Sequence, residues 1–281
     1  MSRTLARIAA TSLLIIAVGH TLIAHDFWIE PSSFAPGVDT AVRVHFRVGD
    51  RFAGDPLGRN ERKIERFFSV APDGSARPIV GRDGMDPAGI VRVDAPGLWI
   101  LGYQGKPSAV TLPAEAFEGY LKEEGLERIS LERAGAGTAG AQGREHFSRA
   151  VKSLVVAGSP DASTLTGYDR ALGLALEILP QANPFEAGRS ELPIRLLFQN
   201  EPLQGALVVA MRKASRAGTA EIVTSMRTDS QGRAVIETGP GLWLIKAVHM
   251  VPAAPGTGVD WESTWTSMTF EVASEGNAAG R

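Results

Sequence analysis

The stretch Ala95-Pro-Gly-Leu-Trp-Ile-Leu101 returns near the other end of the chain as Gly239-Pro-Gly-Leu-Trp-Leu-Ile245. Each copy is a Pro-Gly turn followed at once by an apolar run with Trp at the same place, a pattern typical of a turn that leads into a buried strand. Upstream of each copy, a polar turn lies between short strand-like runs: Pro72-Asp-Gly74 before the first and Asp229-Ser-Gln-Gly232 before the second. The repeat predicts two related β-sandwich modules of about 90 to 100 residues each. A chance likeness between two short phrases is the alternative.

The composition is that of a globular protein with many turns. Of the 281 residues, 44% are hydrophobic, and 31 Gly and 17 Pro fit one or two domains. The 29 Lys and Arg nearly balance the 31 Asp and Glu, so we expect no general attraction to nucleic acid or to anionic lipid. The chain has no cysteine, which excludes disulfides, thiolate catalysis and Cys-based metal sites.

The first residues follow the order of a secretory signal peptide. Arg3 and Arg7 precede the apolar run Ile8–Val18, and a short polar break separates this run from Ala24. The run is short for a membrane span, which needs about 20 residues. An uncleaved anchor is the alternative, and no later segment could cross a bilayer. Cleavage after Ala24 or after Gly19 is compatible with the pattern, so we expect an exported envelope protein without fixing the cleavage site.

Strands and helices are both indicated in the first half. In Ala41–Val48, apolar residues alternate with polar ones, as in a strand with one buried face. Pro113 to Gly125 reads as a helix with Pro near its start and Gly as its stop. A flexible Gly/Ala-rich stretch, 134–143, separates it from a second helical segment, Arg144–Ser153, after which Leu154–Ala157 looks extended.

Several phrases along the chain carry a family likeness. They are Ala24-His-Asp-Phe-Trp-Ile-Glu-Pro31, Arg47-Val-Gly-Asp50, Lys246-Ala-Val-His-Met250 and Asp260-Trp-Glu-Ser263 with Trp265. Together they resemble the periplasmic family known as domain of unknown function 4198, over nearly the whole mature chain. Members are often labelled as components of nickel or cobalt uptake, and related modules are carboxypeptidase-regulatory-like or transthyretin-like sandwiches. The resemblance implies a periplasmic location and a sandwich fold.

The expected organisation combines these signals. The fold class is mainly β, with two Ig-like or transthyretin-like β-sandwich modules and a short helical insertion between them. The expected parts are a signal peptide (1–24), an N-terminal sandwich (25–165) with a helical segment at about 113–153, a C-terminal regulatory-like sandwich (166–272) and a flexible tail (273–281).

His25 is the first candidate for chemistry. If processing removes residues 1–24, the α-amine and the ring Nδ1 of His25 can chelate one ion, and a second imidazole would complete a nitrogen-rich set suited to Cu(II) or Ni(II). The best candidate for that imidazole is His249. On a strand it would project with Trp243, Ile245 and Ala247, opposite to Met250.

Three acidic residues could assist such a site. Asp26, Asp260 and Glu262 could each supply an oxygen ligand or hydrogen-bond an imidazole, and spacing does not say which does so. The alternative is that His25 begins a strand and that His249 is a structural histidine at a core edge. His45 and His146 are expected to be plain surface residues, His146 on a helix, and the aromatic residues Trp261, Trp265 and Phe270 are expected in the core.

Three functions therefore stand side by side. The leading hypothesis is a non-catalytic periplasmic accessory protein that binds Cu, Ni or Co and delivers it to a membrane transporter or another envelope protein. The second is a structural or protein-interaction module without metal. The third is a copper-dependent oxidase. No Gly-x-Ser-x-Gly, His-Glu-x-x-His or phosphate-cradling glycine motif occurs, so we expect no enzyme of those classes.

Overall fold

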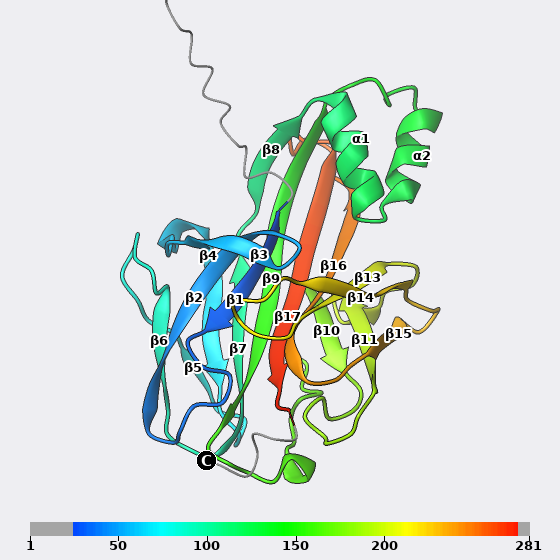
Figure 1. The fold of residues 1–281 in the computed structure, drawn as a ribbon. Coiled ribbons are helices and arrows are strands. Elements are labelled where there is room, and N and C mark those ends of the chain that lie inside the picture. Colours follow the sequence, from blue (N-terminus) through cyan, green and yellow to red (C-terminus); the bar gives the residue numbers. More distant parts are fainter. Residues whose placement is uncertain (1–24, 275–281) are drawn as a thin grey trace, which may run out of the picture.

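The computed structural model describes residues 25–274, so the predicted signal peptide and residues 275–281 of the predicted tail lie outside the described residues. Within this range the chain forms seventeen strands and two α-helices (Figure 1). The strands make three sheets, which confirms the prediction of a mainly β protein.

A nine-stranded sheet, called sheet B, is the middle layer of the molecule. Its order is β14-β13-β16-β17-β9-β7-β4-β5, and β8 also pairs with β9. The two central strands β9 and β17 run parallel, whereas the other described neighbours in this sheet are antiparallel. The strand bounds are β4 Ile64–Val70, β5 Ala76–Pro78, β7 Gly97–Gly105, β8 Ser108–Leu112, β9 Gly143–Ala157, β13 Leu207–Lys213, β14 Glu221–Arg227, β16 Gly241–Pro252 and β17 Trp261–Val272.

Two four-stranded sheets complete the fold. In sheet A, β2 pairs with β1, β3 and β6, and in sheet C, β11 pairs with β10, β12 and β15. Sheet A consists of β1 Asp26–Pro31, β2 Thr40–Asp50, β3 Ala53–Leu57 and β6 Gly89–Val93, and sheet C of β10 Leu176–Pro180, β11 Glu191–Phe198, β12 Glu201–Pro202 and β15 Arg233–Glu237. The apolar alternation predicted for Ala41–Val48 is confirmed, with its even-numbered apolar residues buried in β2.

Sheets A and C cover opposite faces of sheet B. In β7, Trp99, Leu101 and Tyr103 pack in the core beneath sheet A, whereas the alternating Leu98 and Ile100 pack in the core beneath sheet C. The molecule thus has three β layers. The middle layer runs through both halves of the chain, so the two halves share one sheet instead of forming four separate layers.

The quoted repeat occupies matching places in β7 and β16. Trp99 Nε1 donates to the carbonyl of Ala95 at 3.0 Å, and Trp243 Nε1 donates to the carbonyl of Gly239 at 2.8 Å. The turn glycine has a positive φ in both copies, 124° at Gly97 and 135° at Gly241. Trp99 packs beneath sheet A but Trp243 beneath sheet C. The strand orders on the two sides of the parallel β9–β17 pair match after a rotation of sheet B by half a turn about an axis along this pair. That rotation also exchanges the two faces of sheet B, so the equivalent Trp99 and Trp243 pack beneath different sheets.

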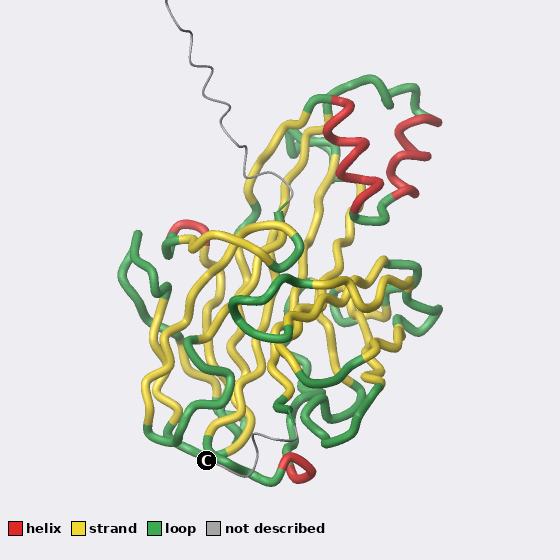
Figure 2. Tube along the Cα trace, in the orientation of Figure 1, coloured by secondary structure: helices red, strands yellow, loops and turns green. Residues whose placement is uncertain are grey.

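The helices lie together at one end of the long strands β9, β16 and β17 (Figures 1 and 2). α1 covers Ala114–Glu123, which confirms the predicted helix, and α2 covers Glu127–Gly135. Gly125, with φ 68°, lies in the turn between them. The short 3-10 helices are Glu61–Lys63 and Ala162–Thr164. The helical insertion joins β8 to β9, within the first half of the chain and not between the two halves.

The predicted second helix, Arg144–Ser153, is wrong. These residues belong to the fifteen-residue strand β9. The sequence contains an alternation that local helix propensity concealed: Val151 and Val155 pack beneath sheet A, whereas Ala150 and Leu154 pack beneath sheet C. Pairing with β7, β8 and β17 on both sides of β9 satisfies its backbone and overrides local propensity.

No helix within residues 25–274 is long and apolar enough to cross a membrane.

Candidate functional site

A cavity of about 320 Å³ opens between sheet A and the adjoining part of sheet B. Its walls combine aromatic rings with basic side chains. The aromatic residues are Phe27, Phe46, Tyr103 and Phe147, and the basic residues are Arg59, Lys63, Lys106 and Arg149. No Asp or Glu is among the residues that line this cavity in the described chain, so it combines an apolar surface with positive charge.

The aromatic wall is packed from three strands. Phe27 of β1 lies 5.2 Å from Tyr103 of β7, and Phe46 of β2 lies 4.9 Å from Tyr103, measured between ring centroids. The rings are tilted or edge-on to one another, the arrangement that aromatic pairs favour. They hold the wall of the cavity rigid because each ring also belongs to the buried core beneath sheet A.

Two of the basic residues are already engaged. Arg59 donates to Glu61 Oε1 at 2.6 Å and to the carbonyls of Ile79 and Ala88. Lys63 donates to Ser108 Oγ at 2.6 Å. These contacts hold the segment that follows β3 against sheet B. Lys106 is exposed to water, whereas Arg149 lies against aromatic rings of the cavity.

Arg149 lies on β9, on the face that points toward sheet A. Its guanidinium carbon is 4.9 Å from the ring centroid of Phe27 and 5.3 Å from that of Phe147. Among residues 25–274 it forms no hydrogen bond or ion pair, and burial lowers the pKa of its guanidinium. The Arg149 side chain is half-buried, so water and the two aromatic faces share in stabilising its charge, and no anionic group in the described chain does so. Arg149 is therefore arranged to receive an anionic group.

The structure separates the two histidines proposed as metal ligands. His249 lies on the sheet C face of β16, with its ring 4.5 Å from Phe198 of β11. Burial, and secondarily the charge of Arg128, lowers the pKa of His249 to about 4. His25 directly precedes β1 and lines a narrow space beside Tyr120 and a larger pocket beside α1, both on the sheet A side. The two rings thus face opposite sides of sheet B.

The acidic candidates are also dispersed. Asp26 Oδ1 accepts from Lys246 at 2.7 Å, and Asp260 forms an ion pair with Arg144 at 2.6 Å. Glu262 is exposed on β17, in register with Val251 and hence on the same face as His249. His25 and Asp26 line one pocket, and no group of three His, Asp or Glu in the described part of the chain is placed to hold a metal ion.

The remaining histidines and aromatic residues have structural surroundings. His45 Nδ1 lies 2.7 Å from Asp86 Oδ1, and His146 lies on β9 and not on a helix. The prediction that Trp261, Trp265 and Phe270 belong to the core is confirmed, since all three are buried.

Comparison with protein families gives a match that covers most of the chain. Residues 22–251 match the domain of unknown function DUF4198. The chain belongs to the DUF4198 family. The match confirms the resemblance seen in the sequence, and the matched range includes His25, Arg149 and His249 but ends before Asp260 and Glu262.

Other comparisons add little about the DUF4198 chain. No curated protein matches it significantly. Solved structures that it resembles include the native form of Escherichia coli alpha-2-macroglobulin and the same protein activated by trypsin or by porcine elastase. Each is 9% identical with a TM-score of 0.20, and each match covers 89% of this chain but only 14%, 16% and 20% of the respective solved chains. The DUF4198 chain therefore spans a fifth or less of their length, and scores this low support no assignment.

A buried carboxylic acid adjoins the cavity of this DUF4198 protein. Glu145 precedes Phe147 and Arg149 on the same face of β9 and contacts Ser263 Oγ and, at 3.2 Å, the hydroxyl of Tyr120. Burial raises the pKa of Glu145 to about 7 although both hydrogen bonds act to lower it. Glu145 and Arg149 line a narrow space with His25, with Phe147 between them on β9, and they form no ion pair with each other.

Sequence reasoning missed Arg149 because the segment was assigned to a helix. The usable signal was a charged residue beside the apolar run Ala150-Val151 and before Leu154–Ala157. In a strand buried on both faces, a charge at such a position points to a specific partner or ligand.

Proposed function

We propose that this chain is a non-catalytic binding protein that holds a small organic anion in the cavity beside Arg149. The observation that carries the proposal is the guanidinium of Arg149, enclosed by Phe27 and Phe147 and without an anionic partner in the described chain. A carboxylate can accept two parallel hydrogen bonds from a guanidinium, and this pairing is stronger in a desolvated site.

The shape and lining of the cavity suggest the class of ligand. Its volume of about 320 Å³ is at the small end of the range typical of ligand pockets. The four aromatic side chains favour an apolar body, and the guanidinium of Arg149, which lies against Phe27 and Phe147, favours a negative charge attached directly to that body. A monocarboxylic acid with an aromatic or short alkyl body fits these features better than a multiply charged phosphate ester.

The proposal also includes a periplasmic location and a fold of two related sandwich halves. The N-terminal pattern and the family likeness support export to the periplasm, where an envelope transporter is the proposed partner. The repeated strand order and the paired Trp99 and Trp243 turns support two related, transthyretin-like sandwich halves that share sheet B. Delivery of Cu, Ni or Co through His25 and His249 gains no support from the geometry, because the two rings face opposite sides of that sheet.

Binding of a carboxylate should depend on Arg149. We expect calorimetric titration with benzoate, phenylbutyrate and octanoate to detect binding, and the neutral amides of the same bodies to bind at least tenfold more weakly. Arg149→Met should lower carboxylate affinity by at least tenfold, or about 1.4 kcal/mol. Because the half-buried Arg149 forms no hydrogen bond or ion pair within residues 25–274, the substitution should not lower the melting temperature.

A matched control is available on sheet A. Arg43 is exposed on β2 and does not line the cavity, so Arg43→Met should bind the acids as the unmodified chain does. Equal affinity for acids and amides, or full affinity in Arg149→Met, would show that the cavity does not recognise anions.

A further inference from the structure

A second pocket, of about 410 Å³, has the opposite charge and shares no lining residue with the Arg149 cavity. It lies where the start of β1 and the end of β2 approach α1. Its charged lining consists of Asp26, Asp50, Glu123, Glu124 and Lys246, and His25 lies among them. Four carboxyl groups thus face one ammonium group.

Lys246 satisfies only part of this set. Its Nζ donates to Asp26 Oδ1 at 2.7 Å and to Glu124 Oε1 at 2.9 Å. The other oxygen of Asp26, Oδ2, has no hydrogen-bond partner within the described chain. Water does not replace this partner, because the Asp26 residue is only 4% exposed. A buried acceptor left without a donor costs about 1 to 3 kcal/mol. Asp26, which lines the pocket, therefore keeps one buried acceptor that no donor of the described chain uses.

The remaining carboxylates lie at the rim. Glu123 is exposed on α1, and Asp50 is exposed at the end of β2, where its nearest cation is Arg51 at 3.8 Å. That pair is open to water and therefore weak. Burial raises the pKa of Asp26 and raises that of Glu124 to about 7, although the ammonium group of Lys246 acts to lower both.

The arrangement suits an extended cation better than a point charge. No three of the acidic or histidine side chains in the part of the chain that the structure describes converge to hold one metal ion. The carboxyl groups come instead from β1, β2, the last residue of α1 and the residue that follows it, and the wall between them includes Leu112, Ala116 and Gly119. A Cβ added at Gly119 would meet nothing within 4 Å, so the helix leaves space there for a methylene chain.

From this geometry we propose that the pocket binds a linear organic di- or polyamine, with its ammonium groups at the carboxylates and its methylene chain along α1. One ammonium group would donate to the carboxyl groups near Asp26, where Lys246 already shows the kind of group that the wall accepts. A second would lie at the rim between Asp50 and Glu123. This site is independent of the anion site proposed above.

The test is calorimetric titration of the full chain with putrescine, spermidine, n-butylamine and Mg²⁺. We expect the diamine and the triamine to bind at least tenfold more tightly than the monoamine. The double variant Asp50→Asn/Glu123→Gln, altered at two exposed positions, should lose at least tenfold in diamine affinity. Glu115→Gln, on α1 but outside the pocket, is the control and should bind normally.

A steric pair of variants gives a second measurement. Gly119→Leu should block diamine binding, whereas Gly135→Leu, at a glycine of α2 where a Cβ is equally unobstructed, should not. Arg149→Met should leave diamine binding unchanged, which separates this proposal from the anion site. Tighter binding of Mg²⁺ than of putrescine, or full diamine affinity in the double variant or in Gly119→Leu, would overturn the proposal.

Discussion

Charged residues on buried strands define what is unusual about this protein. Arg149, Glu145 and Asp26 all lie on the sheet A side of the molecule, near the place where α1 meets the strands. Each is at least partly removed from water. Asp26 has one oxygen without a hydrogen-bond partner, and burial shifts the pKa of Glu145 upward and that of Arg149 downward. Such groups have pH-dependent effects that exposed charges do not have.

Glu145 should make the protein less stable as the pH rises. Its pKa is about 7 in the folded chain against an ordinary value of 4.5, so the folded state retains a proton that the unfolded state has released between these values. Its favourable contribution is complete below about pH 4.5 and is lost as the pH rises through 7, by up to about 3 kcal/mol. Urea unfolding at pH 5, 6, 7 and 8 should show that Glu145→Gln flattens this dependence. Identical slopes in the two proteins would mean that Glu145 ionises normally.

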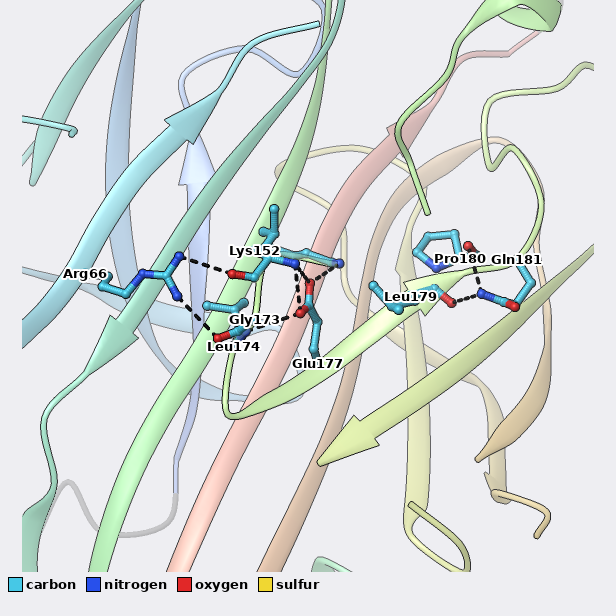
Figure 3. Close-up of polar contacts among 9 residues, drawn as sticks. Arg66, Lys152, Gly173, Leu174, Glu177, Leu179, Pro180 and Gln181 are labelled. Atoms are coloured by element: carbon cyan, nitrogen blue, oxygen red, sulfur yellow. Dashed lines mark hydrogen bonds and ion pairs between the residues drawn. The ribbon is translucent and has the colours of Figure 1, made fainter. Parts of the chain in front are cut away.

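At the scale of elements, a buried ion pair joins the two halves of the chain. Lys152 of β9 donates to Glu177 Oε1 of β10 at 3.1 Å, and both side chains are 2% exposed (Figure 3). Glu177 also accepts from the backbone amides of Leu172 and Leu174, and Arg66 donates to the carbonyl of Leu172. The contact fixes the segment before β10 against the middle of sheet B.

Breaking this pair on one side should be more harmful than replacing both partners. Lys152→Met leaves a buried carboxylate without its cation and should lower the free energy of unfolding by about 3 to 5 kcal/mol. Lys152→Met/Glu177→Gln removes both charges but keeps an acceptor for the backbone amides, so it should recover much of that loss. Chemical denaturation of the single and double variants measures the difference, with the exposed Lys122→Met as a control near zero. A double variant no more stable than Lys152→Met would exclude this explanation.

At the scale of the molecule, the parallel contact between β9 and β17 makes one body of two repeated halves. The core beneath sheet C contains Ile100 and Leu154 from the first half together with Ile178 and Ile245 from the second. Cutting the chain between the halves would remove that shared core and leave β9 and β17 as long unpaired edges.

Neither half should therefore fold alone. We expect fragments 25–165 and 166–274 to lack cooperative thermal unfolding and dispersed amide signals when each is expressed separately. The intact range 25–274 is the control and should show both. A fragment that unfolds cooperatively by itself would establish that the shared sheet is not required for either half.

The sequence alone determined the β class, the helix at Ala114–Glu123, the burial of Val42, Val44 and Phe46, and the matched Trp turns, because each follows from local periodicity or turn chemistry. It also placed His249 correctly with Ile245 and opposite to Met250. These features depend on residues that are close to one another in the sequence, so the local pattern is sufficient to predict them.

Only the tertiary structure decided which sheet each face meets. The parallel β9–β17 contact puts the equivalent faces of the two halves on opposite sides, and this separates His25 from His249. The same contact and its flanking pairs turn Arg144–Ser153 into a strand and direct Arg149 into the aromatic cavity. Local patterns specify that a strand has two faces, but long-range pairing specifies what covers each face, and the chemistry of a site depends on that cover.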